Sequence, residues 1–251
     1  MDEDKIKTLK SWMEEAQKIV FFGGAGVSTE SGVPDFRSKD GLYNQHDVRF
    51  EQYAPEYLLS HSCLMNEPEV YFEFHRQKMD TRKIQPNAAH RYLADLEKTG
   101  KLTAIVTQNI DGLHQKAGSH RVYEIHGSAL RNYCMRCGKT YPEDYIFESK
   151  EPVPHCSCGG VIRPDITLYE ESLPEEAVRG AIQAIAEADI LIIGGTSLTV
   201  YPAASFIQYF LGKRLVIINR DALSVPMHVE TLFIQEKIGE VFTRLRTLQQ
   251  L

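Results

Sequence analysis

The chain has 251 residues, 43% hydrophobic and 25% charged, which is typical of a soluble globular protein with one large domain or one domain carrying an insertion. Its net charge of −6 argues against affinity for nucleic acid or an anionic membrane, and a partner with a lysine-bearing surface fits it better. The N-terminus lacks a signal-peptide core, and the longest apolar runs, such as Ile190–Ile193, cannot span a bilayer. We therefore expect a cytoplasmic protein without membrane segments.

A nucleotide-binding turn is predicted near the N-terminus. Residues 3–17 show helical apolar spacing, and the apolar strand Ile19–Phe22 follows and breaks into the glycine-rich stretch Gly23–Ser38. Glycine lets backbone N–H groups approach a pyrophosphate, and a helix beginning after the turn would add partial positive charge. A plain tight turn is the alternative interpretation.

This stretch departs from the pattern of the dehydrogenases. Its third glycine is replaced by Thr29, and residues 40–46 read as loop. A dehydrogenase has a strand ending in an acidic residue about 20 residues after its glycines. Pro34–Arg37 instead resembles a mobile loop whose aromatic and cationic side chains could fold over a ligand. Hydride transfer is therefore disfavoured.

Helices and strands alternate along the rest of the chain. The expected helices are two in 55–83, interrupted at 66–68, one from the N-cap Asn87 to about Gly100, one at 174–187, one from about Pro202 and one from about 235. The expected strands are 102–107, 122–125, 189–194, 215–219 and an edge strand at 230–234. This alternation predicts a doubly wound, Rossmann-like parallel sheet.

The regions without this alternation are expected to form an inserted small domain. The expected Rossmann-like core covers 1–39, 84–130 and 161–251, and the small domain joins a helical module (40–83) to a zinc ribbon (131–160). Polar segments follow the core strands directly, namely 108–114, His126-Gly127, 195–198 and 219–221. Ligands bind at the carboxyl ends of strands in such sheets.

Four of the five cysteines form two close pairs. The pairs are Cys134 with Cys137 and Cys156 with Cys158, each beside glycine. This arrangement suits one tetrahedral zinc ion, and four thiolates leave no open position, so the site should be structural. The second pair is one residue shorter than usual, which leaves His155 as an alternative ligand. Cys63 is expected to be a small core residue.

His126 is the candidate general base. It stands at a strand end, and Asn109 and Asp111 follow another strand of the same sheet. An imidazole can take a proton from a hydroxyl near neutral pH. A structural role for His126 and a base role for His114 remain alternatives, whereas His90 is expected to be structural. Serine-hydrolase and phosphate-loop motifs are absent.

Five motifs occur in the order found in the sirtuins, the NAD-dependent protein deacylases of the Sir2 type. They are Gly24–Ser28 with Pro34–Arg37, Thr107–His114, Glu124–Gly127, the two cysteine pairs and Gly195–Leu198. The chain resembles the bacterial zinc-containing members of this family over almost its whole length. The resemblance implies a protein-lysine deacetylase that consumes NAD and gives free lysine, nicotinamide and O-acetyl-ADP-ribose.

The resemblance also assigns residue roles. The acetyl oxygen would attack the ribose C1′ as nicotinamide leaves, and His126 would then accept a proton from the ribose hydroxyls, with Asn109 and Asp111 as further catalytic residues. The implied NAD contacts are Gly24, Ala25, Gly26, Thr29, Asp35, Phe36, Arg37, Gln108, Asn109, Ile110, Asp111, His126, Gly195, Thr196, Ser197, Asn219, Arg220 and Ile238. The implied substrate contacts are Ile166, Leu168 and Tyr169.

Two positions depart from the family pattern. The substrate strand of sirtuins commonly ends in Phe-Gly-Glu, whereas this chain has Tyr169-Glu170-Glu171, which affects the shape of the acyl tunnel. Members that prefer succinyl or malonyl groups carry Tyr-x-x-Arg, and this chain has Phe72 and His75 there. Without an arginine to pair with a carboxylate, neutral acyl groups are favoured.

The resemblance implies acetylated-lysine proteins as substrates and a monomer that binds neither membrane nor nucleic acid. A mono-ADP-ribosyltransferase, a deacylase for another neutral acyl group and a zinc-bearing NAD-binding scaffold without turnover are the alternatives. His126 and Asn109 favour deacylation, because only the acyl route needs the base in its second step.

Overall fold

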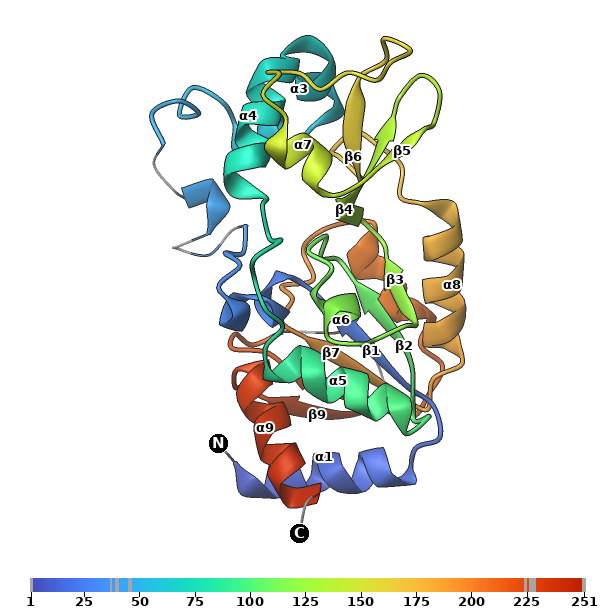
Figure 1. Ribbon diagram of the computed structural model, residues 1–251. Helices are drawn as coiled ribbons and strands as arrows, with labels where there is room; N and C mark the ends of the chain where they lie inside the picture. Colours follow the sequence, from blue (N-terminus) through green and yellow to red (C-terminus); the bar gives the residue numbers. More distant parts are fainter. Residues whose placement is uncertain are drawn as a thin grey trace.

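The computed structural model describes residues 2–36, 38, 41–44, 47–223, 225 and 229–249. Its larger sheet has six parallel strands in the order β3-β2-β1-β7-β8-β9 (Figure 1). The strands are β1 (Ile19–Gly23), β2 (Leu102–Thr107), β3 (Val122–Glu124), β7 (Ile190–Gly194), β8 (Arg214–Ile218) and β9 (Glu230–Ile234). The strand order reverses between β1 and β7, so their carboxyl ends form the switch point where open α/β sheets bind ligands.

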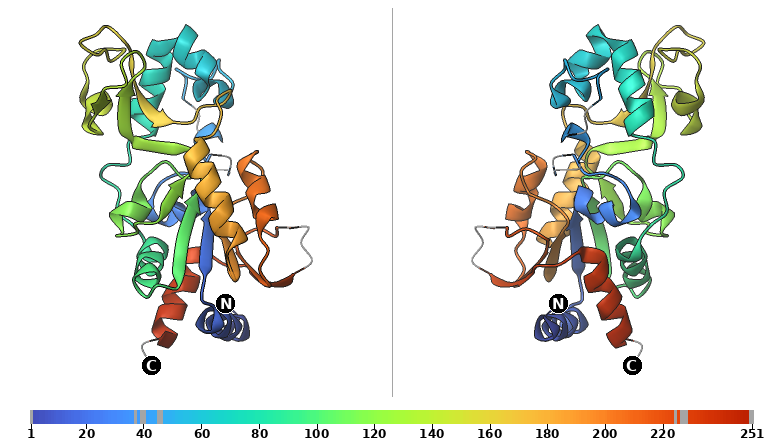
Figure 2. Two further views of the ribbon diagram at one scale, coloured as in Figure 1. Left: turned by 90° about the vertical axis from the view of Figure 1, so that its right-hand side faces the viewer. Right: turned by 90° about the vertical axis from the view of Figure 1, so that its left-hand side faces the viewer.

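Helices cover both faces of this sheet (Figure 2). Ile19 and Phe21 of β1 belong to one core with three helices, and Val20 and Phe22 belong to a second core with two others. The first layer comprises α1 (Glu3–Glu15), α5 (Ala88–Lys98) and α9 (Ile238–Gln249), and the second comprises α8 (Glu175–Ala186) and the 3-10 helix η4 (Ala203–Tyr209). Burial on both faces explains the continuous apolar sequence of β1. The predicted doubly wound sheet is confirmed.

A second, three-stranded antiparallel sheet has the strand order β5-β4-β6 and lies beyond the carboxyl ends of the large sheet (Figure 1). Its strands are β4 (Gly127–Cys134), β5 (Thr140–Tyr141) and β6 (Ile162–Ile166), and the helices around it are α2 (Pro55–Leu58), α3 (His61–Asn66), α4 (Pro68–Lys78) and α7 (Asp144–Glu148). Tyr71 and Phe72 of α4 pack in one core with Ile146 of α7 and Ile162 of β6, and Cys63 is buried there as expected. The helical module and the cysteine ribbon therefore share one core.

Several element boundaries differ from the sequence-based expectation. The second sheet extends from Gly127 to Ile166, beyond the expected 131–160, because Arg163, Pro164 and Asp165 hide the apolar alternation of β6. Proline is tolerated there because β6 is an edge strand. Residues 55–83 form three helices, not two, and the segment after Pro202 is a 3-10 helix. In the described residues, no helix is long and apolar enough to cross a membrane.

The N-terminus of α5 explains one of the two buried histidines near the large sheet. The Asn87 side chain accepts from the backbone N–H groups of Ala89 and His90, and the Asn87 N–H donates to His90 Nδ1 at 3.3 Å. This reciprocal capping satisfies donors that a helix start otherwise leaves free. His90 therefore has the structural role expected from the sequence.

A buried ion pair holds the segment that follows β6. Both Arg163 terminal nitrogens donate to the carboxylate of Glu171, and Arg163 Nη2 also donates to the Ile166 carbonyl at 2.6 Å. Burial raises the pKa of the Glu171 carboxyl, but hydrogen bonds from Arg163, the Leu168 N–H and His61 outweigh it and lower that pKa to about 2. A lowered carboxyl pKa stabilises the fold above pH 4.5 and loses this contribution as pH falls toward 2.

We expect Arg163→Met to lower the free energy of unfolding by about 1–3 kcal/mol at pH 7, because it leaves the partly buried Glu171 carboxylate without its charged partner. The difference from wild type should shrink as pH falls from 5 to 3, where Glu171 of the variant becomes protonated. Urea denaturation at several pH values measures both effects. A difference that stays constant with pH would contradict the assignment to the ion pair.

Candidate active site

A cavity of about 880 Å³ lies at the switch point, between the large sheet and the segments of the second sheet. Its walls come from the residues after β1, β2, β7 and β8, and from the end of β6 and the segment beyond it. The residues assigned from sequence that line it are Gly24, Ala25, Gly26, Thr29, Asp35, Phe36, Gln108, Asn109, Ile110, His126, Ile166, Leu168, Tyr169, Gly195, Thr196, Ser197, Asn219, Arg220 and Ile238. One cavity thus collects residues from seven separate parts of the chain.

One of the assigned residues is not in this wall. Asp111 does not line the cavity and is 6% exposed, directly behind Asn109. Arg37 lies outside the described residues.

The glycines after β1 and β7 allow two loops to touch through their backbones. The Gly26 N–H donates to the Gly195 carbonyl at 2.8 Å, and the Gly24 N–H donates to the Gly194 carbonyl at 3.3 Å. A Cβ on Gly26 would lie 2.8 Å from the Gly195 Cα and carbonyl oxygen, and Gly195 itself has φ +58°. Side chains at these positions would separate the loops, so the glycines permit the close backbone contact at this end of the cavity.

No α-helix follows the first glycine loop. Ala25–Val27 and Thr29–Ser31 are single 3-10 turns, and Gly32 then has φ +91°. The predicted helix N-terminus is therefore wrong, because the chain turns away before a second helical turn can form. The Thr29 hydroxyl instead donates to the Gly26 carbonyl at 3.0 Å and fixes the loop from within.

His126 is half-buried in the cavity wall between β3 and β4. Its Nδ1 donates to the Gln108 carbonyl at 2.9 Å, which places the proton on Nδ1 and leaves Nε2 as the acceptor. Gly127 is required next to it, because φ is +74° and a Cβ would lie 2.0 Å from the Asp165 carbonyl oxygen. The backbone thus fixes both the position of this imidazole and its tautomer.

Burial is the larger influence on His126 and lowers its pKa below 6.5, and the hydrogen bond to the Gln108 carbonyl partly opposes this. The neutral ring is the form that can accept a proton. The alternative base, His114, is 1% exposed and does not line the cavity. Geometry therefore favours His126.

A buried network behind the wall orients Asn109. The Asn109 side-chain N–H donates to the Ser28 hydroxyl at 3.0 Å, and that hydroxyl donates to Asp111 Oδ2 at 2.6 Å. Asp111 Oδ1 accepts from the Leu113 N–H at 2.9 Å. Burial raises the pKa of Asp111, and these two hydrogen bonds oppose the rise. Asp111 therefore acts on the cavity through Ser28 and Asn109.

The segment after β6 forms the opposite wall. The Thr167 N–H donates to the His126 carbonyl at 2.9 Å, so this wall is tied to the candidate base. The Tyr169 N–H donates to the Leu59 carbonyl at 2.9 Å, and the Tyr169 hydroxyl lies 3.2 Å from that of Tyr43. In the second sheet β6 pairs with β4, and on its other side the Ile162 N–H donates to the Pro154 carbonyl at 2.9 Å and the Ile166 carbonyl accepts from the Arg163 side chain.

Glu170 stands where the resemblance to the sirtuins leads us to expect glycine. It adopts φ +76°, a left-handed conformation that costs a residue with a side chain about 1–2 kcal/mol. Its Oε2 accepts from the N–H of Ser62 at 2.8 Å and from the Ser62 hydroxyl at 2.7 Å. These two hydrogen bonds offset the strain and keep the turn that glycine makes freely.

Other lining residues were not predicted from the sequence. They include Ser38, Tyr43, Leu59, Met79, Glu170 and Val200. Leu59 and Met79 follow helices of the inserted module, and nothing in their local sequence distinguishes them from core residues. Ser28 was part of a recognised motif, and its position in the glycine stretch was the signal that could have identified it.

Phe72 and His75 are buried side chains of α4 and do not line the cavity. The His75 ring stacks between Tyr71 and Phe147, and burial lowers its pKa to about 3. Neither residue offers a cation to the cavity.

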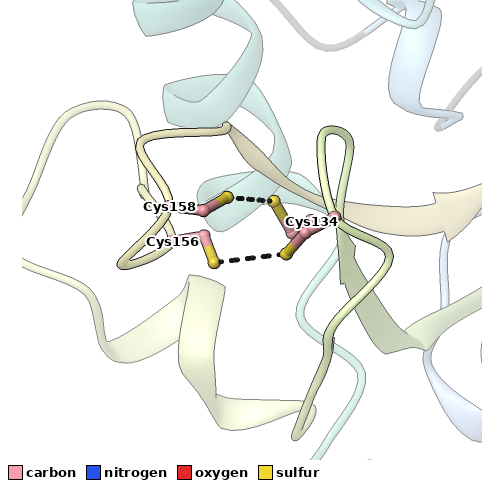
Figure 3. A group of neighbouring side chains, drawn as sticks. Cys134, Cys156 and Cys158 are labelled. Atoms are coloured by element: carbon pink, nitrogen blue, oxygen red, sulfur yellow. Dashed lines mark hydrogen bonds between the residues drawn. The ribbon is translucent and has the colours of Figure 1, made fainter.

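The four clustered cysteines converge in the second sheet, and Figure 3 shows their side chains facing one another. All four Sγ atoms lie within 4.8 Å of one another, with 3.5 Å between Cys134 and Cys158 and 3.7 Å between Cys137 and Cys156. Tetrahedral zinc with Zn–S bonds near 2.3 Å separates its sulfurs by about 3.8 Å, so the cluster fits a structural zinc ion. Gly160 permits the short second pair, since a Cβ there would lie 2.7 Å from Cys134 Sγ.

Comparison with known proteins identifies the family. The Sir2 family model matches residues 24–202. The chain is 53% identical over 239 residues to the protein named NAD-dependent protein deacetylase of Clostridium acetobutylicum, covering 95% of this chain and 96% of that protein. It is 53% identical over 246 residues to the protein of the same name from Clostridium perfringens, covering 97% and 99%.

Solved structures agree with these sequence matches. A Sir2 variant with a deacetylated p53 peptide and 3′-O-acetyl ADP ribose has a TM-score of 0.86 at 34% identity, covering 97% of this chain and 98% of that chain. A Sir2 complex with a p53 peptide and NAD+ has a TM-score of 0.84 at 34% identity, covering 98% of each chain. Fold, site and sequence agree over nearly the whole length: the chain belongs to the Sir2 family.

Proposed function

We propose that this chain is an NAD-dependent protein-lysine deacetylase that forms nicotinamide, O-acetyl-ADP-ribose and free lysine. The observation that carries the proposal is the single cavity joining the paired glycine loops, the oriented imidazole of His126 and the wall from Ile166 to Tyr169. Relatives over 50% identical are named for this activity. A nucleotide and an extended peptide could both reach the same base there.

We infer that the cavity divides NAD between its walls. Gly195, Thr196, Ser197, Asn219, Arg220 and Ile238 would bind the adenosine half, while Ala25, Thr29, Asp35, Phe36, Arg37, Gln108 and Ile110 would hold the nicotinamide riboside. The Gln108 side chain donates to the Thr196 hydroxyl at 3.1 Å and so links the two groups. Asn109 would position a ribose hydroxyl or a water, and Asp111 would support it through Ser28.

The second substrate, an acetylated lysine of a protein, would bind along β6. Ile166, Leu168 and Tyr169 would contact the acyl-lysine, and the peptide backbone would run along this segment. The apolar wall at Leu59 and Met79 suits a neutral acyl group. We also propose that the protein acts as a cytoplasmic monomer.

We also propose that the two sheets of one catalytic domain bind different substrates. The large sheet would hold NAD, and the second sheet with its helices, including the Cys134, Cys137, Cys156 and Cys158 zinc site, would hold the protein substrate. A zinc ion there would stabilise the ribbon that carries β4 and β6. Since β4 begins next to His126, the ribbon also supports the base.

The activity of the enzyme should persist to lower pH than an ordinary histidine would permit. His126 must be neutral to accept a proton, and burial keeps its pKa below 6.5. We expect the acid limb of the profile of kcat/KM against pH to have its midpoint below pH 6.5, since this profile reports the free enzyme. A midpoint above that value would contradict His126 as the buried base.

The test incubates the purified protein with an acetyl-lysine peptide, with and without NAD, and follows peptide mass and O-acetyl-ADP-ribose. We expect loss of the acetyl group only when NAD is present. Cleavage of NAD with the peptide still acetylated would favour the mono-ADP-ribosyltransferase or a deacylase for another neutral acyl group. If neither NAD nor the peptide changes, the zinc-bearing NAD-binding scaffold without turnover is the alternative that remains.

A further inference from the structure

The carboxylate of Glu170 is exposed at the edge of the cavity wall that follows β6. Its neighbour Glu171 is neutralised by Arg163 and hydrogen-bonded by His61. In the described part of the chain Glu170 forms no ion pair, and both of its hydrogen bonds go from Ser62 to Oε2. Oε1 accepts no hydrogen bond from the described residues, so one oxygen of a charged group is available to a ligand.

Glutamate does not stabilise the backbone conformation at position 170. A positive φ of +76° disfavours any side chain and suits glycine better. Ser62 fixes the Glu170 side chain in one orientation, since it bonds through both its N–H and its hydroxyl. An oriented carboxylate loses less side-chain entropy when it pairs with a cation than a free one does.

We propose that Glu170 selects substrates in which a lysine or arginine lies within two residues of the acylated lysine. This inference rests on the proposed function, because it assumes that the acyl peptide runs along the cavity wall from Ile166 to Tyr169, next to Glu170. Residues of an extended strand rise about 3.3 Å each, so the two neighbours on either side of the acyl-lysine pass within reach of a long side chain of the wall. A cation there would pair with Oε1, and an acidic neighbour would be repelled.

The test compares acetyl-lysine peptides that differ only at one neighbouring position, occupied by arginine, alanine or glutamate, for each of the two positions on both sides. We measure kcat/KM with NAD at low and high salt, and peptide affinity by fluorescence anisotropy. At one or more positions we expect arginine to exceed alanine by about two- to fivefold and glutamate to fall below it, as exposed ion pairs allow. The preference should weaken at high salt.

Two variants separate this role from a structural one. Glu170→Gln keeps an acceptor for Ser62 but removes the charge, so the ratio of arginine to glutamate peptides should fall toward one. Glu176→Gln removes the same charge from the exposed start of α8, which does not line the cavity, and should keep the ratio. A purely structural Glu170 would change kcat/KM for all peptides alike and preserve the ratio.

Each outcome decides between the two proposals. Deacetylation without any preference among neighbours, or a preference that survives in Glu170→Gln, overturns the inference and leaves the deacetylase standing. If no peptide is deacetylated, the proposed function fails, and anisotropy then decides the inference. Tighter binding of the arginine peptide that is lost in Glu170→Gln supports it, and equal binding overturns it.

Discussion

Replacing His126 with alanine is expected to lower kcat for deacetylation by a factor of about 10²–10⁴, the usual contribution of a positioned general base. The structure gives the reason, since Nδ1 is fixed on the Gln108 carbonyl and Nε2 is the acceptor in the cavity. Steady-state kinetics with an acetyl-lysine peptide and NAD measures the loss. The fall should appear in kcat more than in KM for the peptide, because the ring contributes to the chemical step.

The matched control is His120→Ala, whose side chain is 86% exposed. It should retain wild-type kinetics. Circular dichroism of both variants should match wild type, because the His126 ring makes one hydrogen bond to a backbone carbonyl and supports no other element. A His126→Ala enzyme that keeps more than a tenth of its kcat would falsify the assignment of the base.

Removing the zinc ligands should have the second large effect. Cys156→Ser is expected to abolish stoichiometric zinc, lower the melting temperature and eliminate deacetylation. Structural zinc sites contribute apparent binding free energies of about 10–16 kcal/mol that become folding free energy. Activity is lost with the fold because β4 and β6 join the ribbon to His126 and to the Ile166–Tyr169 wall.

Metal analysis, thermal denaturation and the deacetylation assay measure these three consequences. Wild type should contain one zinc per chain, and strong chelation should reproduce the effect of the variant. The control is Cys63→Ala, which removes a thiol that lies outside the cluster. It should keep its zinc. Full activity in a zinc-free Cys156→Ser protein would show that the ribbon folds without metal.

The sequence predicted the parts of the fold that follow simple periodic patterns. The strand Ile19–Phe22 and its parallel neighbours are buried on both faces and read as continuous apolar runs. The polar residues after them lie together at one edge because parallel strands share their direction. For this reason the sequence alone indicates that His126, Asn109 and Thr196 lie near one another at that edge.

The rest depends on tertiary contacts that no local pattern encodes. Asp111 follows β2 as Asn109 does, yet its carboxylate accepts a hydrogen bond from the buried Ser28 hydroxyl and does not line the cavity. The position of Glu170 depends on Ser62, a hundred residues earlier in the chain. The residue pattern alone did not indicate β6, which only the resemblance identified as a strand, because Arg163, a cation in its interior, is neutralised by Glu171 beyond its end. Such pairings become visible only when distant segments meet.

The central place of β1 affects how the protein can be made. Ile19 pairs with Leu102 on one side and with Ile190 on the other, so the second partner leaves the ribosome about 170 residues after the first strand. At synthesis rates of about 5–20 residues per second, the apolar Ile19–Phe22 stretch waits roughly 10–30 s with one edge uncovered. An uncovered apolar edge invites pairing with other nascent chains. We therefore expect the yield of native protein to depend on chaperones and on slow expression more than its final stability would suggest.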